Sequence, residues 1–168
     1  MHIYDQSTSR RRRWCTKINW SRELSFSERQ ISYIRNNVPD EQGVYCVYAK
    51  DYCFEYTSPG WSTARTSPVV YIGSGWLGER LATHLGKKEN EVLAEYLSDY
   101  DLAYRFDRIE DGYEWDGPKT VEAVLLNLFE RKFNDLPPAN RRLEAIPELD
   151  LEEFALEESE NFSALVRG

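Results

Sequence analysis

The chain has 168 residues, a formal net charge of −8, and 41% hydrophobic and 14% aromatic residues. This length and apolar content suffice for one domain with a buried core, and they exclude a chain that is disordered throughout. The negative net charge argues against a protein that coats DNA with its whole surface. Because no apolar run approaches the roughly 18 residues of a membrane helix and no apolar signal segment opens the sequence, we expect a cytoplasmic protein.

The charged residues are unevenly distributed along the chain. The first 40 residues are predominantly basic, whereas residues 144–160 are dominated by glutamate. The basic part contains four consecutive arginines: Arg10, Arg11, Arg12 and Arg13. Such a run either contacts nucleic acid or is solvated by counterions or docked on the chain's own acidic surface, and the sequence leaves these interpretations open. The expected segments are a basic N-terminal arm and helix over 1–40, a central domain over 41–141, and an acidic helical extension over 142–168.

Hydrophobic periodicity and turn signals predict the following elements in chain order. The first is a helix that begins at residue 25 or 27 and ends near residue 36. The predicted strands cover residues 43–49, 69–72 and 102–109, and the last of them alternates as a strand with one exposed face does. The other predicted helices cover residues 77–85, 89–99, 118–133 and 151–165. Residues 50–68 are expected to form an excursion between two strands that pair with each other.

Three glycines after the second strand, Gly73, Gly75 and Gly78, match the spacing of a dinucleotide-binding fingerprint. A dinucleotide fold needs several βαβ units whose strands are buried on both faces. Only residues 69–109 could form such a unit, and the acidic residue expected about 20 positions later would precede its second strand. We therefore interpret these glycines as residues that turn the chain sharply from sheet to helix.

Side chains suited to phosphodiester chemistry surround the same segment. Tyr45 and Tyr71 lie on two predicted neighbouring strands, and Glu122 lies near the start of a long predicted helix. Arg80 and His84 are four residues apart and hence share one helix face. Hydrolysis of a phosphodiester needs an acceptor for a proton of water, positive charge at the phosphate and usually a divalent metal held by carboxylate. Each residue alone also has a structural explanation, since tyrosines favour strands and glutamates favour helix N-termini.

The two tripeptides Gly43-Val44-Tyr45 and Tyr71-Ile72-Gly73 resemble the paired motifs of the GIY-YIG nucleases. The resemblance covers about residues 41–141, because the other functional positions follow in the family's order: Arg80, His84, Glu122 and Asn140. It implies an α+β fold with a small, mostly antiparallel three-stranded sheet flanked by helices, extended here by an N-terminal helical arm and a C-terminal helix. The long gap between the tripeptides is similar to that of the restriction-enzyme branch of the family.

The resemblance also implies a function, namely a metal-dependent endonuclease that hydrolyses DNA. In this scheme Glu122 holds one Mg²⁺ or Mn²⁺ ion, and Arg80 binds the scissile phosphate. Tyr45 is the candidate general base for water, Tyr71 orients the water or shares this role, and His84 assists.

The expected partner is DNA, with double-stranded DNA favoured, and no membrane contact is expected. Asn140 is expected to brace the site, and Lys87 and Lys88 join the arginine run as candidate nucleic-acid contacts. Cutting both strands requires a homodimer or two successive nicks. Two other interpretations stay open: a non-catalytic nucleic-acid-binding module with the same fold, and a protein-interaction domain that uses its acidic surface.

Overall fold

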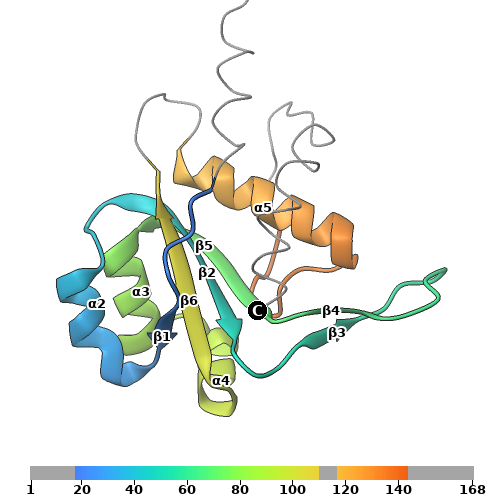
Figure 1. Ribbon diagram of the computed structural model, residues 1–168, viewed down its shortest axis with the longest axis horizontal. Helices are drawn as coiled ribbons and strands as arrows, with labels where there is room; N and C mark the ends of the chain where they lie inside the picture. The colour runs from blue at the N-terminus through green and yellow to red at the C-terminus, as the bar shows by residue number, and fades with distance from the viewer. Residues whose placement is uncertain (1–17, 110–116, 144–168) are drawn as a thin grey trace, which may run out of the picture.

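The computed structural model describes residues 18–109 and 117–143, and these residues form an α+β fold (Figure 1). Its centre is an antiparallel sheet with the strand order β1-β6-β2-β5. These strands are β1 (Leu24–Phe26), β6 (Leu102–Arg108), β2 (Gln42–Ala49) and β5 (Val69–Trp76). A second sheet pairs β3 (Phe54–Tyr56) with β4 (Arg65–Ser67). The helices are α2 (Ile31–Asn37), α3 (Leu77–Gly86), α4 (Glu91–Asp99) and α5 (Pro118–Phe133), with a 3-10 helix, η1 (Glu28–Gln30), before α2.

The three strands expected from the sequence are adjacent members of one sheet, as β6, β2 and β5. The α+β class and the antiparallel pairing are therefore confirmed, but the described sheet has four strands rather than three. The additional strand, β1, pairs with β6 through only three residues, from Leu24 opposite Tyr104 to Phe26 opposite Leu102. A strand this short cannot display the two-residue periodicity on which strand prediction depends.

Strand β5 is longer than the sequence predicts, because it continues through Gly73 and Gly75 up to Trp76, directly before α3. Gly73 pairs with Tyr45 and Gly75 pairs with Gly43 in the neighbouring strand β2. The expectation that the glycines turn the chain from sheet to helix is thus wrong, because Gly73 and Gly75 lie within β5 and Gly78 lies within α3. They provide room for side chains instead, since a Cβ atom on Gly73 would lie 2.5 Å from the hydroxyl oxygen of Tyr45.

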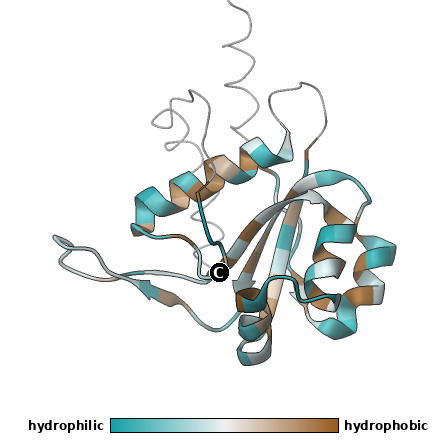
Figure 2. Ribbon diagram, turned by 180° about the vertical axis from the view of Figure 1, so that it is seen from behind, coloured by the Kyte–Doolittle hydropathy of each residue, from teal (hydrophilic) through white to brown (hydrophobic). Residues whose placement is uncertain are grey.

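Helices cover both faces of the central sheet (Figures 1 and 2). On one face, Cys46 shares a hydrophobic core with Phe129 of α5. On the other face, Val47 shares a second core with Leu81 of α3 and with residues of α2 and α4. Neighbouring residues of a strand point to opposite faces, so β2 is buried along its whole length after Gln42.

The alternating sequence of β6 does not produce the exposed face that it predicts. The first three residues of this strand, Leu102, Ala103 and Tyr104, are all buried. Ala103 belongs to the core on the α5 side and Tyr104 to the core on the α3 side. Exposure increases from Arg105 onward, and Arg108 is exposed.

The described helices agree with the predicted ones within a few residues, except at the N-terminal start of the first. That helix begins only at Ile31, because the residues before it form β1 and η1. α5 contains Pro118 in its first turn and ends at Phe133, after which Asn134 adopts a left-handed conformation with φ 58°. The helix predicted at residues 151–165 lies outside the described residues. None of the described helices combines the length and apolar character that a membrane crossing requires.

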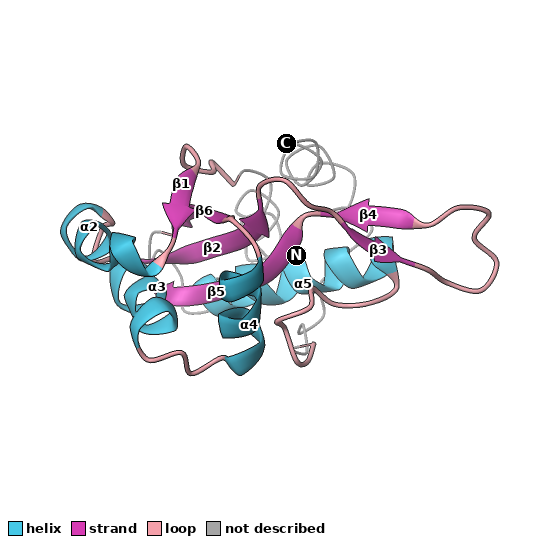
Figure 3. Cartoon of the chain, turned by 90° about the horizontal axis from the view of Figure 1, so that it is seen from below, coloured by secondary structure: helices cyan, strands magenta, loops and turns pink. Residues whose placement is uncertain are grey.

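The segment between β2 and β5 forms the hairpin β3–β4, which projects from the body of the molecule (Figure 3). Tyr56, the last residue of β3, packs against Phe129 and Phe133 and so holds the hairpin against α5. Arg65 pairs with Tyr56 across the hairpin, and its guanidinium lies 4.1 Å from the ring centre of Trp61. The predicted excursion is confirmed, because β2 and β5 on either side of it pair directly.

Candidate active site

A cleft of about 520 Å³ lies along the outer edge of β5. In the described sheet β2 is the one strand that pairs with β5, so no strand of this sheet covers the other edge of β5. Side chains from both faces of the sheet can therefore meet at this edge. The cleft is lined by β5, α3 and α5, by the N-terminus of α4 and by the turn after α5. The polar and aromatic lining residues are Tyr71, Ser74, Trp76, Arg80, Asn90, Lys119, Glu122, Asn140, Arg141 and Arg142.

Tyr45, Tyr71 and His84 form a compact group beside this cleft. The hydroxyl oxygen of Tyr45 lies 2.8 Å from Nε2 of His84, and the ring centres of Tyr71 and His84 are 5.1 Å apart. β2, β5 and α3 each supply one of the three residues. Tyr45 is fully buried and His84 is 6% exposed, whereas Tyr71 is half-buried and lines the cleft. Tyr71 is therefore the phenol that meets solvent, with the other two groups behind it.

Burial dominates the protonation of this group. It raises the pKa of Tyr45 well above its usual value, and the neighbouring Tyr71 raises it further. Burial, followed by the charge of Glu122, also raises the pKa of Tyr71. Burial and the positive charge of Arg80 lower the pKa of His84 to about 4. At neutral pH both phenols are therefore protonated, and the imidazole is neutral and has one nitrogen able to accept a proton.

Arg80 links the two phenols to the cleft. Its charge and a hydrogen bond oppose the effect of burial on both phenols, because they lower the pKa values of Tyr45 and Tyr71. The Arg80 side chain passes next to Gly75, where an added Cβ atom would lie 3.1 Å from Cγ of Arg80. Gly75 also has a φ of +127°, so both space and backbone conformation favour glycine there. A half-buried guanidinium in this position is suited to bind an anion.

Glu122 reaches the cleft from the opposite face of the sheet. It lies near the start of α5, and its Oε2 accepts a hydrogen bond from the hydroxyl of Ser74 on β5. Ser74 lies two residues after Ile72 and hence points to the same face of the sheet, where Ile72 joins the core under α5. Tyr71 points to the other face, toward the core under α3. The cleft therefore joins a carboxylate on one side of β5 to a phenol and a guanidinium on the other.

Asn140 occupies part of the outer edge of β5. Its Oδ1 accepts a hydrogen bond from the backbone N–H of Ile72 at 3.0 Å, and its Nδ2 donates to the carbonyl of Ile72 at 2.8 Å. The backbone N–H of Ala139 donates to the carbonyl of Val70 at 3.0 Å. Asn90 holds this turn in place, since its Nδ2 donates to the carbonyl of Ala139 at 2.9 Å. The turn after α5 thus pairs with β5 as a short strand would.

The structure brings the six predicted catalytic residues together at one edge of the sheet. Four of them line the cleft: Tyr71, Arg80, Glu122 and Asn140. Tyr45 and His84 lie behind this wall. Lys87 and Lys88, at the far end of α3, are not among the lining residues, and Lys88 pairs with Glu28 at 2.6 Å. The four predicted arginine contacts, Arg10 to Arg13, lie outside the described residues.

Several lining residues were not expected from the sequence: Ser74, Trp76, Lys119, Arg141 and Arg142. The spacing of the basic residues contains a usable signal. Lys119 precedes Glu122 by three residues and so shares its helix face, and two arginines directly follow Asn140. Together with Arg80 they place four cationic side chains around the cleft of a protein whose net charge is −8.

A preformed metal cage is not part of this site. Among residues 18–109 and 117–143, no group of three or more His, Cys, Asp or Glu side chains is arranged to hold an ion. The side chains present nevertheless fit Mg²⁺, which commonly binds one or two carboxylates and takes water and substrate phosphate as its other ligands. Glu122 would supply the carboxylate, with the Ser74 hydroxyl fixing the orientation of one of its oxygens.

No family model, curated protein or solved structure matches the chain.

Proposed function

We propose that the chain is a metal-dependent endonuclease of the GIY-YIG type, which hydrolyses phosphodiester bonds in DNA. The observation that carries this proposal is the convergence of Glu122, Arg80 and Tyr71 on one open cleft. These residues belong to α5, α3 and β5, and they reach the cleft from both faces of the sheet. A structural role for each residue separately would not require that a carboxylate, a guanidinium and a phenol meet.

The pairing of the strands supports the family assignment. The two strands that contain the tripeptides, β2 and β5, are antiparallel neighbours, with Tyr45 opposite Gly73. β6 lies on the other side of β2. In this proposal β6, β2 and β5 are the three-stranded core of a GIY-YIG domain, and β1 is an added edge strand.

Arg80 binds the scissile phosphate in this proposal. Its guanidinium carries a permanent charge and several donors, which suits the phosphate oxygens and the charge that develops during hydrolysis. The exposed cations at the mouth of the cleft, Lys119, Arg141 and Arg142, contact neighbouring phosphates of the same DNA. This local concentration of positive charge would allow an acidic protein to bind a polyanion.

The phenols and the imidazole move the proton of the attacking water. A protonated phenol can accept this proton only if it passes its own proton on. Tyr71 meets the water and shares a hydrogen bond with Tyr45, whose hydroxyl lies 2.8 Å from Nε2 of the neutral His84. Because Tyr45 is fully buried, we assign Tyr71 as the first acceptor of the proton and Tyr45 as the group that relays it to His84.

Glu122 is the residue that would hold the divalent metal. When bound, Mg²⁺ or Mn²⁺ supplies Lewis-acid stabilisation of the negative charge on the phosphate. The Ser74 hydroxyl donates to Oε2 of Glu122 and so helps to orient this carboxylate toward the cleft. In this proposal Ser74 therefore supports the metal-binding carboxylate.

Glu122→Gln tests the proposal, with Glu130→Gln on the same helix as the matched control. Losing one preorganised electrostatic contribution costs on the order of 3 kcal/mol, or a hundredfold in rate. We expect Glu122→Gln to nick supercoiled plasmid at least about a hundredfold more slowly than wild type in Mg²⁺ or Mn²⁺. Glu130→Gln should retain activity, and EDTA should stop all cutting.

Far-UV circular dichroism and thermal unfolding establish that both variants are folded. Equal nicking by wild type and Glu122→Gln would refute the assignment. Metal-independent DNA binding without nicking in any divalent ion would instead support a non-catalytic nucleic-acid-binding module.

A further inference from the structure

Trp76 is an exposed aromatic residue that lines the cleft. The described chain exposes four large hydrophobic residues: Tyr33, Tyr52, Trp76 and Leu143. Trp76, which is 48% exposed, is the one among these four that lines the cleft. Single exposed hydrophobic residues are common on protein surfaces and by themselves indicate nothing. The position of Trp76 next to the candidate catalytic groups is what gives it significance.

The strand geometry places the indole beside the carboxylate side of the cleft. Trp76 is the last residue of β5, and residues two apart in a strand point to the same face. Trp76 therefore follows Ser74 on that face at a backbone distance of about 7 Å. Ser74 in turn donates to Glu122. On the other side of the strand, Arg80 passes next to Gly75, directly before Trp76.

The remaining walls of the cleft are positively charged. Lys119 comes from the first turn of α5, and Arg141 and Arg142 follow the turn that Asn140 fixes to β5. All three of these cationic residues are exposed. An aromatic surface among cations is the combination by which proteins bind single-stranded nucleic acid, since cations contact the backbone and a base stacks on the ring.

A base in a continuous duplex is already stacked on its neighbours and paired with its partner. It can offer its face to a protein ring only when it is single-stranded, bulged or turned out of the helix, and turning it out costs a few kcal/mol. A cleft with a stacking ring beside its phosphate-binding groups therefore discriminates between substrates by how easily one base becomes free.

We propose that Trp76 is the stacking platform for an unpaired base next to the scissile phosphate. The cleft accordingly prefers DNA that contains a single-stranded or bulged nucleotide over continuous duplex DNA. The location of the scissile phosphate rests on the proposed function, whereas the contact between base and indole can be tested without cleavage.

The experiment compares three fluorescein-labelled DNA hairpins. One has a continuous stem, one has a single unpaired nucleotide in the stem, and one has an abasic nucleotide at that unpaired position. Binding is measured by fluorescence anisotropy in EDTA, so that cleavage does not interfere. Cleavage of the same hairpins is then measured in Mg²⁺ and Mn²⁺.

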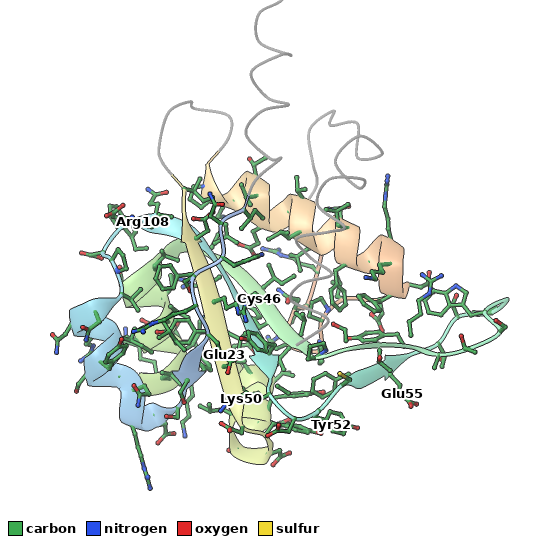
Figure 4. All side chains as sticks on the ribbon, viewed as in Figure 1. Glu23, Cys46, Lys50, Tyr52, Glu55 and Arg108 are labelled. Carbon is green, nitrogen blue, oxygen red and sulfur yellow. The ribbon has the colours of Figure 1, made fainter. Side chains whose placement is uncertain are left out.

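Four proteins are compared: wild type, Trp76→Ala, Trp76→Phe and Tyr52→Ala. Tyr52 is a closely matched control because it is 49% exposed and aromatic but is not among the lining residues of the cleft. Tyr52 follows the end of β2, whereas Trp76 pairs with Gln42 at the start of β2. Figure 4 shows Tyr52 at the opposite end of the sheet from Arg108, which pairs with Gly43 next to Gln42.

We expect wild type to bind the hairpin with the unpaired base roughly 5- to 150-fold more tightly than its abasic counterpart. Trp76→Ala should abolish this difference, while Trp76→Phe should retain most of it because the ring can still stack. Tyr52→Ala should behave as wild type. Thermal unfolding of each variant identifies any loss of fold, and the folded Trp76→Phe keeps the comparison informative.

The proposal is overturned if wild type binds the unpaired-base and abasic hairpins equally, or if Trp76→Ala preserves the difference. Base-dependent binding that requires Trp76, without cleavage in either ion, would support the stacking contact and refute the nuclease assignment. Cleavage without base-dependent binding would support the nuclease assignment and refute the stacking contact.

Discussion

Tyr45 and His84 are in contact in the protein interior, where ionisable and unpaired polar groups are unfavourable. Both groups are ionisable and buried, and Nδ1 of His84 has no hydrogen-bond partner within the described residues. A buried polar nitrogen without a partner lowers stability. Strongly shifted pKa values of this kind cluster at functional sites, although structural networks also produce them. The proposed proton relay would give the arrangement a purpose that packing alone does not supply.

The pKa of His84 predicts a loss of stability in acid. An imidazole in the unfolded chain titrates near 6.5, but burial and Arg80 lower the folded value to about 4, so the unfolded state binds more protons between these values. The stability associated with neutral His84 is therefore complete above pH 6.5 and is lost as the pH falls toward 4. Between pH 7 and pH 5, we expect the free energy of unfolding to fall by roughly 2 kcal/mol more in wild type than in His84→Gln.

Urea unfolding of both proteins at pH 7, 6 and 5 measures this difference. Only the change with pH is compared, so a constant destabilisation by the substitution does not affect the result. Parallel pH profiles for the two proteins would contradict the buried, neutral state of His84.

The sequence predicts which residues belong to the candidate site, but it does not predict how buried each of them is. Tyr45 ends one of the two tripeptides and Tyr71 begins the other, and nothing in the tripeptides says which phenol meets solvent. The difference arises because Tyr45 lies on β2, which has neighbours on both sides, whereas Tyr71 lies on the outer strand β5. Strand order is set by long-range pairing, which the local pattern does not contain.

At the scale of elements, the outer edge of β5 is paired along one half and open along the other. Along its first half, the turn after α5 takes the position of a further strand through Ala139 and Asn140. Along its second half, the edge is open to the cleft at Ser74 and Gly75. A sheet edge that is partly paired is protected from association with other chains, and here the part that stays open is the part that lines the cleft.

Asn140→Asp tests this edge pairing. The substitution keeps the size of the side chain and the acceptor for the N–H of Ile72, but it replaces the donor to the carbonyl of Ile72 by a second oxygen. We expect a loss of about 1–3 kcal/mol in the free energy of unfolding, because two acceptors would then face each other in a partly buried place.

The control for this prediction is Asn37→Asp. The Nδ2 of Asn37 donates to the carbonyl of Tyr33 in an exposed position, where water can replace the contact. Urea unfolding at pH 7 should give a smaller loss for Asn37→Asp than for Asn140→Asp. Equal losses at the two positions would show that the pairing with Ile72 contributes no special stability.

Among the elements, α5 was predictable in full because its apolar residues recur over 16 residues and Pro118 marks its start. The end of β5 was not predictable from the same kind of signal. Gly73 and Gly75 favour a turn by their local conformational freedom, but they are used within a strand because Tyr45 and Arg80 occupy the space above them. The competing cause is a tertiary contact, which a local signal cannot reveal.

At the scale of the whole molecule, the net charge of −8 conceals the charge of the cleft. Arg80, Lys119, Arg141 and Arg142 are spread over 63 positions of the sequence, on two helices and a turn. A sum of charges over 168 residues cannot indicate that these four side chains line one cleft. The sequence therefore supported one α+β domain and a catalytic set, but not the local electrostatics that the proposed substrate requires.

The salt dependence of DNA binding tests this local charge. Lys119→Ala, Arg141→Ala and Arg142→Ala should each reduce the slope of log K against log salt concentration by about 1, if each residue contacts one phosphate. Arg131→Ala is the control, because this arginine is exposed on α5 but does not line the cleft. Anisotropy titrations over a range of salt concentrations give the slopes, and the same change for Arg131→Ala would contradict a localised contact.

The hydrogen bonds between Asn140 and Ile72 join residues 68 positions apart. During synthesis, a chain that has emerged only as far as α5 already contains Tyr45, Tyr71, Arg80 and Glu122, but it lacks the turn that occupies the edge of β5 and supplies one wall of the cleft. A contact of this range is formed against the entropy of closing the intervening chain. The complete cleft consequently requires the chain through Arg142, and a chain that ends at Phe133 would lack this wall.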